Sequence, residues 1–268
     1  MKATLITVLA LLFLQSLIVH PLLAQTNIAI SAKPIVNKHD PEPELFQNSF
    51  LKKIDNISGV DILSKNIDAI GGINQLKSIQ SLDFKGSLEI SGMKFNFSER
   101  KEFPNLDYIA LSIDKDTILR SVFDGKSGYN QEISGKKSLT DDEIKERNQD
   151  NLALFNQISY LDSSKKFHLT NISKDNAGDS AFYRLDIKTP SGKLISEFYD
   201  TTTFLLTKSI EKEKIDSDST VTYKSFGNYR KINGVQFPYS IDIQKIQNGK
   251  EQNIAISIES VQINLPTE

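Results

Sequence analysis

The chain has 268 residues, with 32 Lys and Arg against 34 Asp and Glu, so its formal net charge is −2. This balance gives no basic surface for nucleic acid, and the absence of Cys excludes disulfides and an acylated N-terminal cysteine. With three His and no pair at ligand spacing, the composition also argues against a zinc, copper or haem site, and no cofactor is predicted.

The first 24 residues have the pattern of a secretory signal peptide. Lys2 supplies a positive charge, residues 5–23 are largely apolar, and Ala24 precedes Gln25 at the expected cleavage point. No later stretch has the roughly 18 apolar residues of a membrane-spanning helix. We therefore expect an exported, soluble mature protein that is not lipid-anchored and has no transmembrane segment.

Residues 25–57 contain Pro34, Pro41 and Pro43 and no sustained periodicity, so they are interpreted as a flexible or disordered leader. The folded domain is predicted to comprise residues 58–268. It opens with apolar residues at helical spacing between Val60 and Ile70, stopped by a Gly-Gly pair and followed by a second short helix up to residue 79.

From residue 82 onward the apolar period changes to two. Residues 82–90 and 93–98 alternate around a Ser-Gly turn, which predicts an antiparallel hairpin. A change of parity between Ile258 and Val261 predicts a bulge in the last strand. The other predicted strands are 108–113, 117–123, 128–133, 167–172, 182–188, 193–199, 205–211, 220–226, 235–246 and 253–263.

One helical insertion interrupts the strands. Thr140 and Glu143 have the spacing of a capping box, and the segment becomes apolar toward Phe155. Two interpretations remain open: a helix lying across an opening of the sheet, or an ordinary solvated helix between two strands.

These elements predict an α+β fold, a strongly curved antiparallel half-barrel of about ten strands with two or three helices over its concave face. If side chains leave the centre unfilled, the interior is an apolar cavity suited to a lipid or acyl chain. Glu99 and Lys101 share the parity of the apolar residues before them, so they point inward or lie at the barrel rim. The candidate cavity residues are Phe84, Leu88, Ile90, Phe95, Phe97, Ile109 and Leu111.

Motifs for catalysis are missing from the sequence. It has no nucleophile elbow, zinc-protease motif, phosphate-binding loop or dinucleotide fingerprint. Neighbouring carboxylates are more often solvated faces than acid–base pairs. We therefore expect a protein that is not an enzyme.

Four segments together resemble the lipoprotein-sorting (LolA/LolB-like) family of periplasmic proteins. They are the helix, Gly-Gly and helix opening at 66–81, the FDGKSGY turn at 123–129, the YDTTTFLL turn at 199–206 and the YRKINGVQFPY hairpin at 229–239. The resemblance implies a curved sheet that holds acyl chains under its helices, in a periplasmic protein. The receiving type of the family is itself a lipoprotein, and the missing Cys rules against that type.

Two functions follow as hypotheses. The first is a monomeric, non-catalytic periplasmic carrier for a lipid or acylated, lipoprotein-like cargo. The second is a structural or accessory envelope protein with a filled core that acts through contacts with other proteins.

Overall fold

The computed structural model describes residues 53–149, 154–177, 180–215 and 218–265. The predicted signal peptide and nearly all of the predicted leader lie outside the described residues. The leader's last five residues, 53–57, form strand β1 (Lys53–Ile54) and the start of β2 (Ile57–Ser58), and Ile57 is buried. The folded structure thus already includes the end of that segment.

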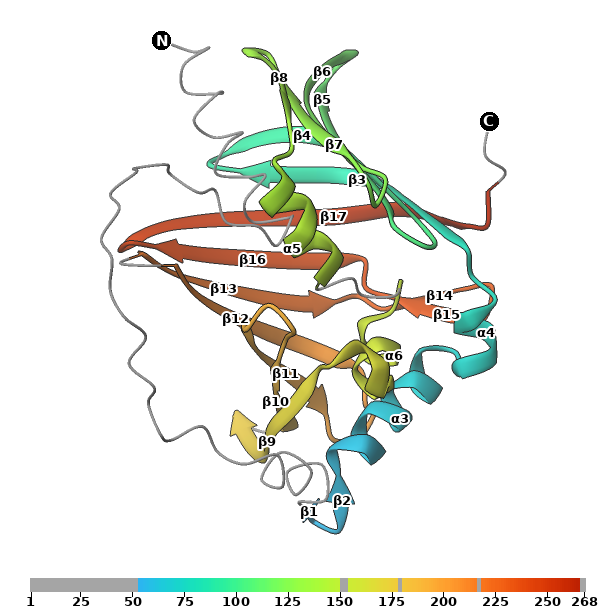
Figure 1. Ribbon diagram of the computed structural model, residues 1–268. Coiled ribbons are helices and arrows are strands. Elements are labelled where there is room, and N and C mark those ends of the chain that lie inside the picture. Colours follow the sequence, from blue (N-terminus) through green and yellow to red (C-terminus); the bar gives the residue numbers. More distant parts are fainter. Residues whose placement is uncertain (1–52, 150–153, 178–179, 216–217, 266–268) are drawn as a thin grey trace, which may run out of the picture.

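A single sheet of thirteen strands dominates the fold (Figure 1). Its order is β8-β7-β6-β5-β4-β3-β17-β16-β13-β12-β11-β10-β9, and every neighbouring pair is antiparallel. The strands are β3 (Ser81–Ile90), β4 (Met93–Glu102), β5 (Leu106–Ile113), β6 (Asp116–Phe123), β7 (Gly128–Glu132), β8 (Gly135–Ser138), β9 (His168–Ala177), β10 (Ser180–Lys188), β11 (Leu194–Asp200), β12 (Leu206–Ile215), β13 (Asp218–Gly227), β16 (Ser240–Gln247) and β17 (Lys250–Ile263).

The first and last strands of this sheet in chain order, β3 and β17, meet at its middle. Strand β17 pairs with β3, so the hairpins from the two halves of the chain form one continuous surface. The pairing shifts between Ile258 and Ser260, which confirms the bulge predicted from the parity change. The sheet curls but does not close, because β8 and β9 remain at its two edges.

The sheet has more strands than the roughly ten given for the half-barrel: each of the twelve strand segments predicted above contributes to it, and β8 is the additional strand. All four residues of β8 are exposed, so this strand carries no alternation of apolar and polar residues. The predicted strand 235–246 is divided: β14 (Arg230–Ile232) and β15 (Val235–Phe237) form a separate hairpin, and β16 begins after Pro238. Proline lacks the N–H that a ladder needs, so it ends the first strand.

Helix α3 (Gly59–Ile70) forms where the periodicity predicted it. Ser58 caps its first turn: the Ser58 hydroxyl accepts a hydrogen bond from the Asp61 amide at 3.1 Å, and the Asp61 carboxylate accepts one from the Ser58 amide at 2.8 Å. Gly71 ends the helix at φ 144°, a backbone region that favours glycine. Helix α4 (Ile73–Lys77) follows at once.

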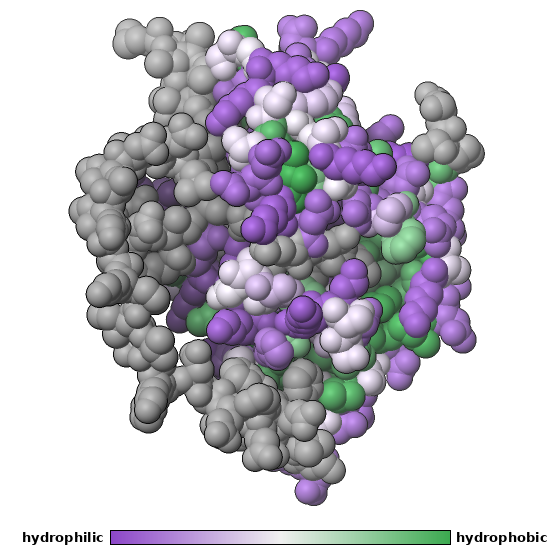
Figure 2. All heavy atoms as spheres, in the orientation of Figure 1, coloured by the Kyte–Doolittle hydropathy of each residue, from purple (hydrophilic) through white to green (hydrophobic). Residues whose placement is uncertain are grey.

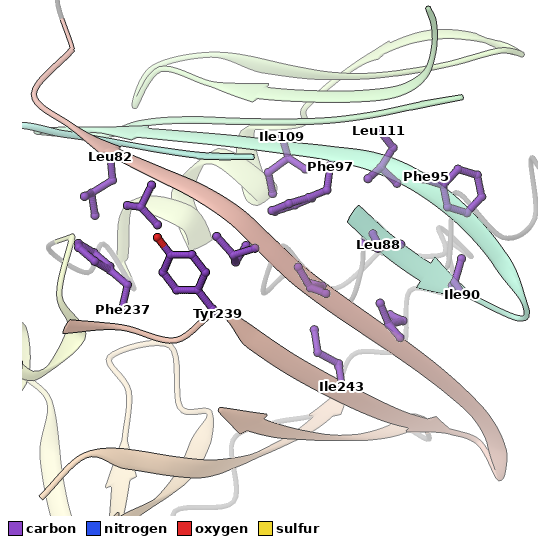
Figure 3. Packing of buried hydrophobic residues seen from close by; sticks show 14 of the residues in the cluster. Leu82, Leu88, Ile90, Phe95, Phe97, Ile109, Leu111, Phe237, Tyr239 and Ile243 are labelled. Carbon is purple, nitrogen blue, oxygen red and sulfur yellow. The ribbon is translucent and has the colours of Figure 1, made fainter. Parts of the chain in front are cut away.

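The helices pack on one side of the sheet, over two hydrophobic clusters. Helix α3 joins them, since Leu63 belongs to the cluster on β9–β11 and Ile67 to the larger one on β3–β6, β16 and β17. Helix α6 (Asn156–Leu161) lies beside α3 and contributes Tyr160 to the cluster on β9–β11. The 3₁₀ turn η1 (Ser163–Lys165) follows α6 and contacts it. Figure 3 shows the larger cluster, with Phe97 and Ile109 directed to the same side of β4 and β5.

Helix α5 (Asp141–Gln149) is the predicted insertion and starts at the predicted capping box. The Thr140 amide donates to the Glu143 carboxylate at 2.6 Å, and the Glu143 amide donates to the Thr140 hydroxyl at 3.3 Å. In the view of Figure 1, α5 crosses in front of β16 and β17. Residues 150–153, which follow it, lie outside the described residues.

Among the described residues, no helix combines the length and the apolarity needed to cross a bilayer. Hydrophilic residues cover most of the face in Figure 2. Hydrophobic ones gather mainly on the right, in the part of the view where Figure 1 has α4 and the β14–β15 hairpin. Ile73 of α4, 37% exposed, is one of the large apolar side chains left at the surface.

Candidate functional site

A cavity of about 320 Å³ lies between the concave face of the sheet and the elements that cover it. The sheet contributes residues from β3, β4, β12, β13, β16 and β17. The cover is formed by α3, by Leu154 and Phe155 with the start of α6, and by the segment from Gln236 to Pro238. The interior of the curled sheet is therefore not completely filled.

Strand alternation places the apolar part of the cavity wall. Phe84 on β3, Ile241 on β16 and Ile256 on β17 share the concave face because successive side chains on a strand point to opposite sides. Phe237 closes this part by an edge contact with Phe84 at 6.0 Å and a tilted contact with Phe155 at 6.3 Å between ring centroids. The wall here suits a hydrocarbon chain.

The remaining wall includes three charged residues, Glu99, Lys101 and Lys224, and each of them belongs to an ion pair. On β4, the Lys101 ammonium lies 3.2 Å from the Glu99 carboxylate. On β13 and β12, the Lys224 ammonium donates to the Glu211 carboxylate at 2.6 Å. Burial raises the pKa of Glu99, although Lys101 opposes the shift. The Glu99 carboxylate in turn raises the pKa of Lys101.

A buried polar cluster lies behind this wall and joins α6 to the sheet. Glu197 on β11 is 2% exposed and accepts hydrogen bonds from the hydroxyls of Tyr199 and Tyr160, the latter at 3.2 Å. The Gln157 side chain, which lines the cavity, donates to the Tyr199 hydroxyl at 3.4 Å. Burial raises the pKa of Glu197 to about 7, and the two tyrosine hydrogen bonds offset only part of this.

Asn66 of α3 is a further buried polar residue beside the cavity. Its side-chain amide donates to the Phe204 carbonyl at 2.7 Å, which fixes α3 to the turn between β11 and β12. Its Oδ1 atom is buried without a hydrogen-bond partner among the described residues. An unpaired acceptor costs free energy, so this position is held by the packing around it.

The seven sequence-predicted residues all belong to the larger hydrophobic cluster or pack against it, but only two of them line the cavity. Phe84 and Phe97 line the cavity. The other five are at most 5% exposed, lie within the cluster and do not line the cavity: Leu88, Ile90, Phe95, Ile109 and Leu111.

Sequence reasoning left Glu99 and Lys101 either inside or at the rim, and the structure places both on the cavity wall. It did not single out Lys224, Asn66 or Gln157. Lys224 had a usable signal, because it shares the parity of Phe226 in a predicted strand. The sequence holds no such signal for Asn66 and Gln157, because a polar residue on a helix is expected to face solvent.

The described part of the chain holds no group of three or more His, Cys, Asp or Glu side chains that would bind a metal ion. His168 lies exposed on β9. The Arg120 guanidinium lies over the Tyr108 ring at 5.9 Å, and Arg120 does not line the cavity. What the arrangement provides is a cavity with one apolar and one charged part.

Comparisons with known proteins identify the fold. No protein-family model and no curated protein matches the sequence. Among solved structures, a LolA superfamily protein from Nitrosomonas europaea matches with a TM-score of 0.51 and 10% identity, over 78% of this chain and 96% of that one. A putative outer membrane lipoprotein-sorting protein domain from Vibrio parahaemolyticus matches with a TM-score of 0.54 and 9% identity, over 78% and 94%.

At these identities the likeness concerns the fold alone. It covers 78% of the chain and confirms the resemblance carried by the four sequence motifs. The chain has a LolA-like fold.

Proposed function

We propose that this protein is an exported, monomeric, periplasmic carrier that binds the acyl chain of a lipid or of an acylated protein and catalyses no reaction. The observation that carries the proposal is the cavity of about 320 Å³ under α3 and α6, which has a largely apolar wall. Ligand pockets begin at about 300 Å³, so the space suits a single chain better than a bulky one.

In this proposal Phe84 and Phe97 contact the chain directly. Leu88, Ile90, Phe95, Ile109 and Leu111 share the same face of the sheet and pack in the hydrophobic cluster beside the cavity. The signal peptide pattern and the LolA-like fold support a periplasmic location and a carrier role.

The first test is native mass spectrometry of the mature protein purified from an envelope extract, before and after delipidation. We expect added mass that matches a phospholipid or acyl chain and is lost on delipidation. A clean apo mass, with no uptake of added fatty acid, would contradict the carrier proposal.

A substitution that fills the cavity tests its location. Ile241 lines the cavity and is only half-buried, so Ile241→Trp adds volume there without opening the core. We expect it to reduce fatty-acid uptake about tenfold or more, because a filled pocket loses the apolar burial that drives binding. Ile133→Trp is the matched control, since Ile133 is 60% exposed and lies outside the cavity.

The alternative is an accessory envelope protein that acts through protein contacts. The observation in its favour is that five of the seven predicted cavity residues are buried in the core and do not line the cavity. Under this alternative neither tryptophan variant changes lipid uptake, because there is none to change.

A further inference from the structure

The charged residues on the cavity wall need an explanation that a hydrocarbon chain does not give. Glu99 and Lys101 continue the concave face of β4 directly after Phe97, and Lys224 follows the same pattern beside Phe226. The Glu99, Lys224 and Glu211 side chains are between 17% and 21% exposed, and Lys101 is 43% exposed. Partly exposed ion pairs of this kind add little to stability, so packing alone does not require them.

Residues from distant strands bring both signs of charge to one cavity. In the sheet, β4 and β13 are separated by β3, β17 and β16. Glu99 and Lys224 nevertheless line the same cavity, and the Lys224 charge acts on the Glu99 carboxylate. The curl of the sheet therefore brings one anion, Glu99, and two cations, Lys101 and Lys224, to the cavity wall, while Glu211 pairs with Lys224 from outside the lining.

Both signs of charge also have hydrogen-bonding capacity left. An ammonium has three donors and a carboxylate about four acceptor sites. Within the described residues, the Lys224 ammonium donates to Glu211 and the Lys101 ammonium pairs with Glu99. A bound polar group can therefore be recognised without breaking either pair.

The surrounding charges decide which polar group fits. Asp107 acts on Glu99 and Lys101 from β5, and Glu197 lies close to Glu211 and Lys224. A purely anionic head would meet these carboxylates, whereas a purely cationic head would meet the two ammonium groups. A head that carries both charges can pair with Glu99 and with Lys224, which both line the cavity.

We propose that the cavity selects a zwitterionic amphiphile, whose ammonium group lies toward Glu99 and whose anionic group lies toward Lys224. The inference rests on the proposed carrier function and adds the class of polar group that enters the cavity with the chain. Lys224 and Glu99 are its specificity-determining residues.

A series of single-chain amphiphiles tests this directly. Dodecylphosphocholine, dodecyl phosphate, dodecyltrimethylammonium and the nonionic decyl glucoside are titrated into the mature protein by calorimetry, each below its micelle-forming concentration. We expect the zwitterion to bind at least about tenfold more tightly than the other three, since one hydrogen bond to a charged group has an effect of this size.

Lys224→Met should change the order of preference rather than only weaken binding. It leaves the Glu211 carboxylate without its ammonium partner, so we expect the cationic amphiphile to bind at least as tightly as the zwitterion. The control is Lys208→Met, because Lys208 lies on β12 with its ammonium over the rings of Phe198 and Tyr223 and does not line the cavity. It should keep the original order.

If Lys224→Met does not fold, the double variant Lys224→Met with Glu211→Gln removes both charges of the pair and leaves no unpaired carboxylate. In that protein the zwitterion should lose its advantage over decyl glucoside. Equal binding of all four amphiphiles by the unmodified protein, or an unchanged order in the folded variants, would overturn the inference while leaving the carrier function intact. Binding of none of them, with a clean native mass, would instead overturn the carrier function.

Discussion

Glu197 is deeply buried and, within the described part of the chain, accepts hydrogen bonds from two tyrosines and from no cationic side chain. Its pKa in the folded state is raised from 4.5 to about 7, chiefly because burial disfavours the charged carboxylate. A raised carboxyl pKa means that the folded state holds the proton more tightly than the unfolded state. Glu197 therefore contributes stability at low pH, and this contribution is lost as the pH rises from about 4.5 through 7.

We predict that the free energy of unfolding falls between about pH 5 and 8, with a Glu197 contribution of about 3 kcal/mol at most. Glu197→Gln keeps the shape but cannot ionise, so its unfolding free energy should fall less over the same range. Glu99 also has a raised pKa, so some decline remains in the variant. Urea denaturation at several pH values measures the difference.

Carboxylates whose pKa is lowered in the folded state stabilise it more as the pH rises, and they do so in a lower pH range. Hydrogen bonds from backbone amides lower the pKa of Asp124 and Asp200, so these residues lose stabilisation only below about pH 4. Glu259→Gln, at an exposed position of β17, is the control for Glu197→Gln. Identical pH profiles for the two variants would show that Glu197 does not titrate in this range.

Helices α3 and α5 start with the same capping chemistry but have different roles in the fold. Ser58 begins α3, which joins both hydrophobic clusters. Thr140 begins α5, which contributes no residue to either cluster. The same loss of a cap should therefore have a global effect in one case and a local effect in the other.

We predict that Ser58→Ala lowers the global free energy of unfolding by about 1 kcal/mol, because the cap is lost from a helix that the core depends on. Thr140→Ala should leave global unfolding almost unchanged and increase amide hydrogen exchange within α5. Denaturant titration and hydrogen exchange of both variants separate the two effects. Equal global losses would show that α5 belongs to the cooperative core.

Elements with a local signal could be predicted from the sequence. The α3 stripe, the Gly71 stop, the Thr140 capping box and the bulge near Ile258 each follow from spacing within a few residues. Strand β8 could not be predicted, because its residues are all exposed and nothing alternates. A helix or strand can be predicted from the sequence where the burial of one face imposes a regular spacing on its apolar residues.

The cavity could not be predicted from residue spacing, because it is formed by residues that lie far apart in the sequence. Parity places Phe84, Leu88 and Phe97 on the concave face, but it does not distinguish a residue that lines the cavity from one that is packed within the cluster, as Leu88 is. Glu99 and Lys224 come together only through the curl of the sheet. That curl depends on how the whole sheet packs on its helices.

At the scale of the whole molecule, an open sheet leaves two edges whose backbone groups can pair with another chain. At one edge, β9 contacts β1, and the Lys174 ammonium pairs with the Asp55 carboxylate at 2.6 Å. At the other, β8 pairs with β7 on one side only and presents Lys136 and Lys137. Charged edge residues of this kind oppose edge-to-edge association.

We predict that Lys136→Val with Lys137→Val makes the protein associate with itself at concentrations where the unmodified chain is monomeric, because the edge gains β propensity and loses its charges. The control is Lys85→Val with Lys94→Val, which removes the same two charges from exposed positions on β3 and β4. Both of those strands have neighbours on each side, so their backbone groups are already paired. Light scattering across a concentration series should show larger species for the edge variant alone. Association of both variants to the same extent would mean that the loss of net charge, and not the exposed strand, controls assembly.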